Sequence, residues 1–572
     1  MRTELRFVLA IGLMFLVLVG TNVLFPPVVP EIETPADRVG MDAGLDSGVP
    51  AVEATPTLPP PPATTGGTGA PPPDAGSVAP PVAVEQRIVV EGPLYRFVFS
   101  SVGARVLSAE LPEFESLRHD GVVDLVAPGA EGYLSQRLLV GSDTVDLRRA
   151  QYRVTPAEGL ELSAGGSRQS LSFVYEHPTR AFRFEMEYTF DPELYLVGVR
   201  GRVSGLDRPV LLTNLGDGLA YAEADSAQEA RMMAYVYNHR GEGIRSTLLT
   251  RAEPTFVEGP LLWAGFRNKF FVLALLAGES EQSVTDSEYL GGLIVGESAL
   301  PDRVQVQTAQ SIGNDGAFTY RLYMAPQIYD RLATLGQGME EVNPYGWRFF
   351  RPIVRPFVSV IMVILVFLHT NLSIGYGWVL VVFGVAMRIV LFPLNHKAMK
   401  AQLRNMAVQP LVAEIQKRYK DNPEKLQKEM MRLYKEHGFN PLAGCLPMLL
   451  PWPVLIALFF VFQNTIELRG VPFLWLPDLS AKDPFYMLPV ILAVSMFLMQ
   501  WVSMRSLDQP NAQMKMMMYI MPIMMLFIFA NLASGLNLYY ATANIATIPQ
   551  QMWIASERKK MKGLPPPKLS DD

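Results

Sequence analysis

The stretch 378–394, which reads WVLVVFGVAMRIVLFPL, is apolar throughout except for Arg388. A run of this length and composition is typical of a helix that spans a lipid bilayer. Apolar stretches of similar character lie at about 356–370, 445–466, 485–504, 516–531 and 535–554. From about residue 350 onward the sequence therefore predicts a polytopic α-helical membrane protein.

The segment 395–442, which follows the first stretch, is strongly basic and is predicted to be cytoplasmic by the positive-inside rule. The tail 558–572 also begins with basic residues and is assigned to the same side. Asn422 is a suitable N-cap for a helix that starts at Pro423. Leu426, Met430 and Leu433 would share one face of that helix, and Met399, Leu403 and Met406 form a similar stripe earlier. Two amphipathic helices of this kind predict a cytoplasmic helical hairpin.

The N-terminal end carries a separate apolar run, from Phe7 to Phe25, preceded by Arg2 and Arg6. Either a signal peptide or an uncleaved anchor would have this composition. The run is longer than the roughly 7–15 residues of a signal core, and no A-x-A site follows it. We therefore expect residues 1–25 to be an anchor with a cytoplasmic N-terminus. Residues 26–85 are rich in proline, glycine, alanine and threonine, which predicts a disordered tether.

Residues 86–340 are predicted to form a large all-β sandwich domain outside the cytoplasm. Strand-forming runs occur at 87–90, 95–99 and 182–188, and the last alternates apolar with charged residues. The run 194–197 is too short for its period to distinguish a strand from a helix. Lys269 is the first lysine of the chain, and all other lysines follow residue 396. A chain polarised in this way usually extends across two compartments.

The charge pattern also predicts how many segments cross the membrane. If the anchor spans, an odd number of crossings must separate the β domain from the basic segment 395–442. Only one of the two apolar stretches between them can then cross, and we expect the first to lie as an interfacial helix on the outer surface. This gives six spans, five of them in the C-terminal unit. The predicted segments are the interfacial helix 345–371, span 2 at 372–394, the hairpin 395–442, span 3 at 445–466, span 4 at 485–504, span 5 at 516–531 and span 6 at 535–557.

Arg388 is the most informative single residue, because charges within spans are costly and usually face protein or a water-filled recess. A second interpretation is that its side chain extends to the nearby headgroups. The spans also contain polar amides that could equally form helix–helix hydrogen bonds. They are Gln463, Asn464, Asn537, Asn544 and Gln550. Tyr539 and Tyr540 could belong to an aromatic belt at the membrane interface. Methionines are abundant near residues 514–525, which suits either lipid contact or adaptable apolar surfaces.

Signatures of catalysis are missing from the sequence. It contains no G-x-x-x-x-G-K-[ST], H-E-x-x-H or G-x-S-x-G motif. The six histidines are scattered, and a single cysteine, Cys445, cannot form a disulfide within the chain. The sequence therefore predicts neither an enzyme nor a metal site, and it indicates no cofactor.

Three motifs stand out in the C-terminal unit. They are RIVLFPL at 388–394 followed by the basic hairpin, NPLAGCLP at 440–447, and SGLNLYY at 534–540. In these motifs the unit resembles the YidC family of membrane insertases. The resemblance covers roughly residues 345–560. The anchor, the tether and the β domain resemble the Gram-negative form of the family.

The resemblance implies a protein of the bacterial inner membrane with both termini cytoplasmic and the β domain periplasmic. It implies a five-helix core around a hydrophilic groove that receives nascent membrane proteins and helps them insert and fold. The expected partners are those proteins, the Sec translocon, membrane lipids and, as a further candidate, the ribosome, with no specific nucleic acid. Some relatives carry a hydroxyl one turn before the groove arginine, where this chain has Gly384. The β domain is expected to be a supersandwich similar to mutarotase-like folds. The groove is expected to be lined by Arg388, Tyr539, Tyr540, Gln463, Asn464, Asn537 and Trp452, and the hairpin to receive substrates through Lys417, Arg418, Lys425 and Lys428.

Two other classes of function remain open from the sequence. A transporter would use Arg388 to bind its substrate, and it predicts internal repeats and broken helices. A sugar-active enzyme would use the β domain, and it predicts clustered histidines and carboxylates there.

Overall fold

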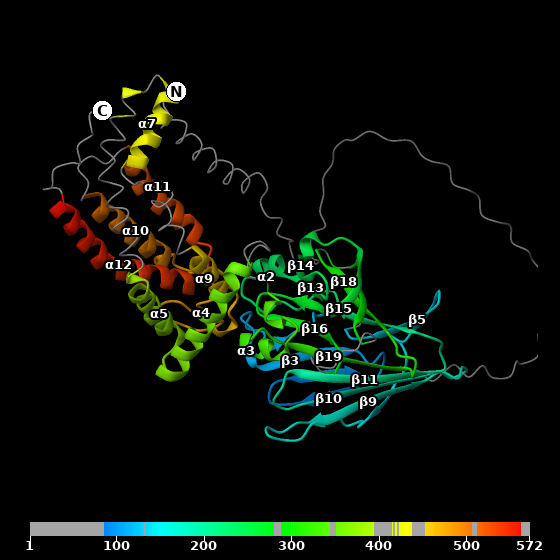
Figure 1. Ribbon diagram of the computed structural model, residues 1–572. Helices are drawn as coiled ribbons and strands as arrows, with labels where there is room; N and C mark the ends of the chain where they lie inside the picture. The colour runs from blue at the N-terminus through cyan, green and yellow to red at the C-terminus, as the bar shows by residue number, and fades with distance from the viewer. Residues whose placement is uncertain are drawn as a thin grey trace, which may run out of the picture. The chain divides into compact units, whose positions relative to one another are not determined.

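The computed structural model describes residues 85–561 with several gaps (Figure 1). The residues outside the description are 1–84, 131–132, 280–287, 299, 301, 344–350, 394–414, 416–417, 420–421, 437–451, 506–511 and 562–572. The predicted anchor, the tether up to residue 84, the first arm of the hairpin and most of the basic tail therefore lie outside the described residues.

The β domain contains two sheets, and the smaller has five strands in the order β4-β3-β2-β1-β8. Its strands are β1 (Arg87–Glu91), β2 (Arg96–Ser100), β3 (Val106–Glu115), β4 (Val122–Asp124) and β8 (Leu160–Glu161). Neighbouring strands are antiparallel except β1 and β8, which pair in parallel at Val90↔Leu160.

The larger sheet has 14 strands, of which β13 and β14 branch from β15. The other strands follow the order β6-β5-β12-β18-β17-β15-β16-β19-β11-β10-β9-β7. Its strands are β5 (Gln136–Val140), β6 (Asp143–Asp146), β7 (Arg153–Thr155), β9 (Gln169–Glu176), β10 (Arg183–Phe190), β11 (Leu196–Ser204), β12 (Val210–Gly216), β13 (Ala234–His239), β14 (Gly243–Leu248), β15 (Thr255–Arg267), β16 (Phe271–Ala277), β17 (Leu290–Glu297), β18 (Val304–Ser311) and β19 (Ala317–Pro326).

The strand predictions from the sequence are confirmed. The runs at 87–90, 95–99 and 182–188 fall in β1, β2 and β10, and the ambiguous run at 194–197 leads into β11. In β10 the apolar side chains Phe184, Met186 and Tyr188 are buried while their neighbours reach the surface. The two-residue period therefore marks which face of the sheet is covered.

The two sheets pack face to face through aromatic side chains. Phe99 of β2 is fully buried, and its ring centroid lies 5.1 Å from that of Tyr188 and 5.7 Å from that of Phe173. Phe97 and Phe190 extend the same cluster. Tilted and edge-on ring contacts of this kind add to the free energy gained from burial alone.

The helices of the membrane unit follow the β domain along the chain. Two short helices, α2 (Ser226–Met232) and α3 (Tyr329–Leu335), and the 3₁₀ turns η2 (Leu249–Arg251) and η4 (Met339–Glu341) belong to the β domain or its end. The membrane unit comprises α4 (Arg351–Leu372), α5 (Tyr376–Val390), α7 (Pro423–Glu436), α9 (Trp452–Asn464), η5 (Ile466–Leu468), α10 (Met487–Arg505), α11 (Ala512–Phe529) and α12 (Ser534–Met561). In this unit α12 packs against α5 and α10, α4 against α9, and α10 against α11 (Figure 1).

Length and composition single out one of the described helices as able to span a bilayer, namely Pro352–Leu372 of α4. Four more helices are apolar but shorter: Tyr376–Val390, Val454–Asn464, Met487–Val502 and Met518–Phe529. They coincide with four of the predicted spans. The helix that passes the length test is thus the one that the charge pattern predicts to be interfacial.

The predicted cytoplasmic hairpin is described mainly through α7. Asn422 caps this helix, because its Oδ1 accepts a hydrogen bond from the amide of Lys425 at 3.1 Å, as predicted. Leu433 is buried with Ile415, and Leu426, Met430 and Tyr419 pack against them. The predicted apolar face of α7 is therefore confirmed, whereas the stripe at Met399, Leu403 and Met406 lies outside the described residues.

Candidate functional site

A cavity of about 550 Å³ lies between α5 and α12 and contains Arg388. The α5 side contributes Val385, Arg388, Ile389 and, just beyond the helix, Phe392. The α12 side contributes Ala546, Pro549, Gln550 and Trp553. Apolar side chains make up most of the lining, so Arg388 and Gln550 are its polar groups.

Arg388 sits in the last turn of α5 and is partly buried. A cation at this position is favoured by the partial negative charge at a helix C-terminus. The sequences of α4, α5, α9, α10 and α11 contain no aspartate or glutamate. In the part of the chain that the structure describes, no carboxylate forms an ion pair with Arg388. Tyr539 and Tyr540 are close enough to interact with it electrostatically. The cavity therefore presents a cation whose charge is not neutralised by a described carboxylate.

Two close contacts hold α5 against α12 on the side of the cavity toward the start of α12. A Cβ atom placed on Gly384 would lie 3.3 Å from Cγ2 of Thr542, and one placed on Gly535 would lie 3.2 Å from Cδ1 of Leu380. C-terminal to Gly384, from Val385 on α5 and from Ala546 on α12, residues of the two helices line the cavity. Gly384, where the family resemblance led us to compare this chain with relatives that carry a hydroxyl, is therefore one of the close contacts between the two helices.

Gly384→Leu is expected to destabilise the packing of α5 against α12 by about 1–3 kcal/mol, because the added atoms overpack a tight contact. Gly384→Ala should be nearly neutral, since Thr542 would need to move by only a few tenths of an ångström. Gly375→Leu is the matched control, because a Cβ at Gly375 meets nothing within 4 Å. Thermal unfolding of the detergent-solubilised protein measures all three, and equal midpoints for the two leucine variants would contradict the tight contact.

Pro549 lines the α12 side of the cavity and interrupts the backbone hydrogen bonding of α12. Proline has no backbone N–H, so the carbonyl of Ile545 cannot receive its usual helical hydrogen bond. Ile545 is not among the residues that line the cavity, so Gln550 is the α12 residue whose side chain can both donate and accept hydrogen bonds there.

The two predicted tyrosines lie in the helix packing close to this cavity. Tyr539 is buried and its ring lies 5.6 Å from those of both Phe383 and Phe462. Tyr540 is less buried and contacts Phe529 at 5.3 Å. Both interact electrostatically with Arg388, so the structure brings these three predicted residues together.

The other predicted groove residues lie elsewhere. Asn537 is fully buried and its Nδ2 donates to the carbonyl of Phe529 at 3.0 Å, which links α12 to α11. Asn464 lines a separate small cavity with Tyr329 and Glu467. Gln463 is partly buried in α9, and Trp452 begins α9 with a side chain outside the description. None of these four lines the cavity that contains Arg388.

The predicted hairpin residues are described in part. Lys425 and Lys428 are exposed on α7, and Arg418 is exposed just before it. Lys417 lies outside the described residues. The described hairpin thus offers basic side chains to solvent opposite its apolar face.

Sequence reasoning missed Trp553 and Thr542, and it noticed Gln550 only as a polar residue of the last span. The spacing of Ala546, Pro549, Gln550 and Trp553 places all four on one face of a helix. That spacing could have identified the face, but which helix it packs against is a matter of tertiary contact.

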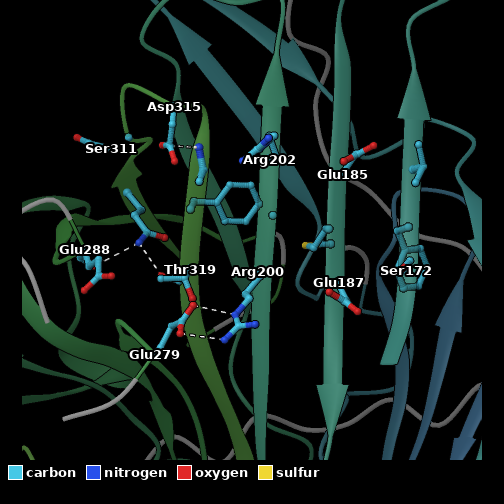
Figure 2. Close-up of a pocket in the computed structure, with 18 residues that line it drawn as sticks. Ser172, Glu185, Glu187, Arg200, Arg202, Glu279, Glu288, Ser311, Asp315 and Thr319 are labelled. Atoms are coloured by element: carbon cyan, nitrogen blue, oxygen red, sulfur yellow. Dashed lines mark hydrogen bonds and ion pairs between the residues drawn. The ribbon is translucent and has the colours of Figure 1, made fainter. Parts of the chain in front are cut away.

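The β domain carries a separate polar cleft of about 670 Å³ (Figure 2). Arg200 and Glu279 form a two-point ion pair across it at 2.8 and 2.9 Å, and Gln310 donates to the carbonyls of Glu288 and Thr319. No histidine is among its lining residues. Among the residues that the structure describes, no group of three histidine, cysteine, aspartate or glutamate side chains could hold a metal ion. The clustered histidines that a sugar-active enzyme would need are not found in this cleft.

Comparison with known proteins matches both halves of the chain. The family model described as YidC periplasmic domain matches residues 87–360, and the model described as 60Kd inner membrane protein matches residues 367–562. A membrane protein insertase YidC of Chlorobium limicola is 30% identical over 499 residues, which cover 82% of this chain and 83% of the relative. This chain belongs to the YidC family. A YidC insertase of a Geobacter species is also 30% identical, over 82% of this chain and 86% of its own length.

A solved structure of an active YidC insertase with its first transmembrane segment resolved also matches. Its identity is 18%, its TM-score is 0.33, and the match covers 82% of this chain and 93% of the solved chain. YidC family membership places the helices in the inner membrane and the β domain in the periplasm. The resemblance inferred from three short motifs is thereby confirmed.

Proposed function

We propose that this chain inserts nascent membrane proteins into the inner membrane and helps them fold, using the cavity between α5 and α12 as its substrate groove. The observation that carries the proposal is Arg388, a partly buried cation that lines this cavity without a carboxylate partner among the described residues. Its chemistry suits the acidic or polar part of a passenger chain. The named relatives are membrane protein insertases, which supports the same assignment.

The proposed mechanism is physical and needs no covalent step. A passenger arrives with an apolar segment and a short polar stretch that must cross the membrane. Arg388 and Gln550 would solvate that stretch part-way, which shortens the apolar distance it must travel. The apolar segment then leaves along the apolar side chains of the cavity into lipid, because burial in lipid lowers its free energy.

The partners beyond the passenger are part of the proposal. Exposed Lys425 and Lys428 on α7 provide a basic surface that could receive an acidic passenger or the ribosome at the cytoplasmic face. Cooperation with the Sec translocon rests on the family resemblance.

We also propose the predicted topology of six spans, with α4 lying along the periplasmic surface. Three contacts support this position of α4. Arg355 pairs with Glu340 and Glu341 at the end of the β domain, and Met362 contacts Thr465 at the end of α9. At the start of α5, Gly377 packs against Phe473 in the segment that follows α9. The start and the middle of α4 and the start of α5 thus all meet segments on the β-domain side of the membrane unit.

Asn371→Cys tests this topology, because position 371 would be periplasmic for an interfacial α4 and near the cytoplasm for a spanning one. In a Cys445→Ser background, we expect a membrane-impermeant thiol reagent added outside spheroplasts to label the Asn371→Cys protein. Leu194→Cys in the β domain is the labelled control, and Lys425→Cys is the protected one. Protection of Asn371→Cys would show that α4 crosses the membrane.

The proposed function is tested by depleting the protein in its native cell and following insertion of a short, acidic-tailed membrane protein by protease protection. Restoration of insertion by the wild-type gene is the expected result. Failure of the wild-type gene to restore insertion, at normal levels of the protein, would return the transporter and sugar-active enzyme to consideration.

A further inference from the structure

Lys269, the only lysine in the first 396 residues, is buried between the β domain and the membrane unit. It lies between β15 and β16, and its Nζ donates to the carbonyl of Ser480 at 2.9 Å. Ser480 belongs to the α9–α10 loop, defined here as residues 465–486. Burial lowers the pKa of Lys269, while the carboxylates of Glu223 and Asp478 favour its charged form. Burying an ammonium group costs free energy. The burial of Lys269 therefore indicates that its contacts have a structural or functional role.

Arg469 in the α9–α10 loop makes a second, independent connection to the β domain. Its side chain is 4% exposed, and its Nε lies 2.6 Å from Oε1 of Glu223. The same guanidinium donates to the carbonyls of Glu115 and Ala222 and lies over the ring of Phe271. One arginine therefore joins three separate segments of the β domain to the loop.

The two connections are joined to each other inside the β domain. Glu229 of α2 accepts hydrogen bonds from the amides of Ala222 and Glu223, both at 3.0 Å. Its other carboxylate oxygen accepts from Nδ2 of Asn268 at 2.6 Å, next to Lys269. Glu229 thus holds the segment that binds Arg469 against the segment that carries Lys269.

The α9–α10 loop in turn holds the N-terminus of α12. The amides of Ser534 and Gly535 donate to the carbonyls of Ala481 and Leu479, at 2.7 and 2.8 Å. The hydroxyl of Ser534 donates to the carbonyl of Asp478 at 2.9 Å. These carbonyls flank Ser480, the residue that Lys269 binds. A hydrogen-bonded path therefore runs from the β domain through the loop to the helix that carries Tyr539 and Tyr540.

We propose that Lys269 and Arg469 are positioning residues for insertion, through which the β domain fixes the α9–α10 loop and thereby α12 relative to Arg388. The inference rests on the proposed function of the groove. It gives the β domain a mechanical role, which is to keep the α12 side of the groove in place while passengers enter and leave.

A positioning role can be separated from a contribution to the stability of the β domain. Replacing both partners of a buried ion pair with apolar side chains is often neutral for the fold, whereas removing one partner leaves a buried charge unpaired and is strongly destabilising. The hydrogen bond of Lys269 is to a backbone carbonyl, so Lys269→Met should leave the thermal midpoint of the β domain close to that of wild type. Arg469→Met leaves Glu223 unpaired and should lower the midpoint, so it is compared with Glu223→Gln, in which Arg469 keeps its two carbonyl acceptors. Lys269→Met removes a charged donor to the loop, and Arg469→Met removes charged donors from the loop to the β domain. The loss of positioning should therefore appear in the loop and at the start of α12.

The test uses the full-length protein in reconstituted membranes, with Lys269→Met, Arg469→Met and Glu223→Gln. Glu223→Gln weakens the Arg469 contact from the β-domain side with little change of shape. Lys482→Met is the matched control, because Lys482 also joins the loop to the β domain, through Asp225 at 3.5 Å, but is about half exposed. Exposed pairs of this kind contribute little.

Two quantities are measured on each variant. Amide hydrogen exchange at Ser534 and Gly535 is expected to quicken by about tenfold or more in the three test variants, with the strands β16 and β19 unchanged in Lys269→Met and Glu223→Gln. The insertion rate at saturating passenger is expected to fall by about fivefold or more, with the half-saturating concentration unchanged. Lys482→Met should match wild type in both.

Either of two results would overturn the inference while wild type remains active. One is unchanged exchange at Ser534 and Gly535, and the other is faster exchange with wild-type insertion. A wild-type protein that inserts no passenger would overturn the proposed function instead. Unfolding of the β domain in the two methionine variants, with normal exchange in Glu223→Gln, would assign these charges to stability.

Discussion

Arg388→Ala is expected to reduce insertion of a passenger with an acidic tail by about tenfold, with normal accumulation of the protein. Two opposite unit charges about 6 Å apart attract by roughly 2–3 kcal/mol at an effective dielectric constant of about 20. Solvent screening of a partly exposed cation reduces this value, which leaves about tenfold in rate. The measurement is protease protection of the passenger after depletion and rescue.

Arg388→Lys and a change of passenger serve as the controls. Arg388→Lys keeps the charge and should retain most of the activity, although a lysine cannot bind a carboxylate through two parallel hydrogen bonds. A passenger whose acidic residues are replaced by neutral amides should depend much less on Arg388. Full activity of Arg388→Ala with the acidic passenger would mean that this arginine extends to the headgroups and that the cavity receives passengers by apolar contact alone.

Phe99→Ala is expected to destabilise the β domain by about 3–5 kcal/mol, because it removes the ring at the centre of the contact between the two sheets. Phe99 is fully buried, and its ring lies within 6.1 Å of those of Phe97 and Phe190 as well as near Tyr188 and Phe173. The amides of β2 and β10 should report the loss by hydrogen exchange, since central strands exchange through global opening of a domain.

Leu194→Ala is the control for this prediction. Leu194 is an apolar side chain of the same domain that is 46% exposed, and its truncation should change stability by less than about 0.5 kcal/mol. Equal exchange rates in the Phe99→Ala and Leu194→Ala proteins would contradict the packing of the two sheets through the aromatic cluster.

Several features of this chain could be predicted from sequence because their physical causes are local. The alternation in 182–188 predicted β10, since a strand exposes every second side chain to the same environment. Asn422 predicted the start of α7, since a cap acts on an amide three residues away. An arginine in an apolar stretch marked α5 as unusual, since the cost of a charge in lipid depends on the bilayer. Three motifs were enough to identify the family.

The tertiary structure decided which of these residues meet. Asn464 and Asn537 carry the same amide group as Gln550, and Asn537 even lies on the same helix, yet of the three only Gln550 shares a cavity with Arg388. Packing between helices chooses the face of each helix, and hydrophobicity that is nearly uniform around a span carries little information on that choice. Gly384 likewise looks like a missing hydroxyl in the sequence, whereas in the structure it admits Thr542 of α12.

Lys269 illustrates the same division most clearly. The sequence by itself determined that a lone lysine stands in the otherwise lysine-free first 396 residues, and that an apolar, strand-forming region surrounds it. Only the tertiary structure placed its ammonium group on the carbonyl of Ser480, which is 211 residues away in the chain. Local patterns determine elements because their interactions span a few residues, but contacts between distant segments depend on how the finished elements pack.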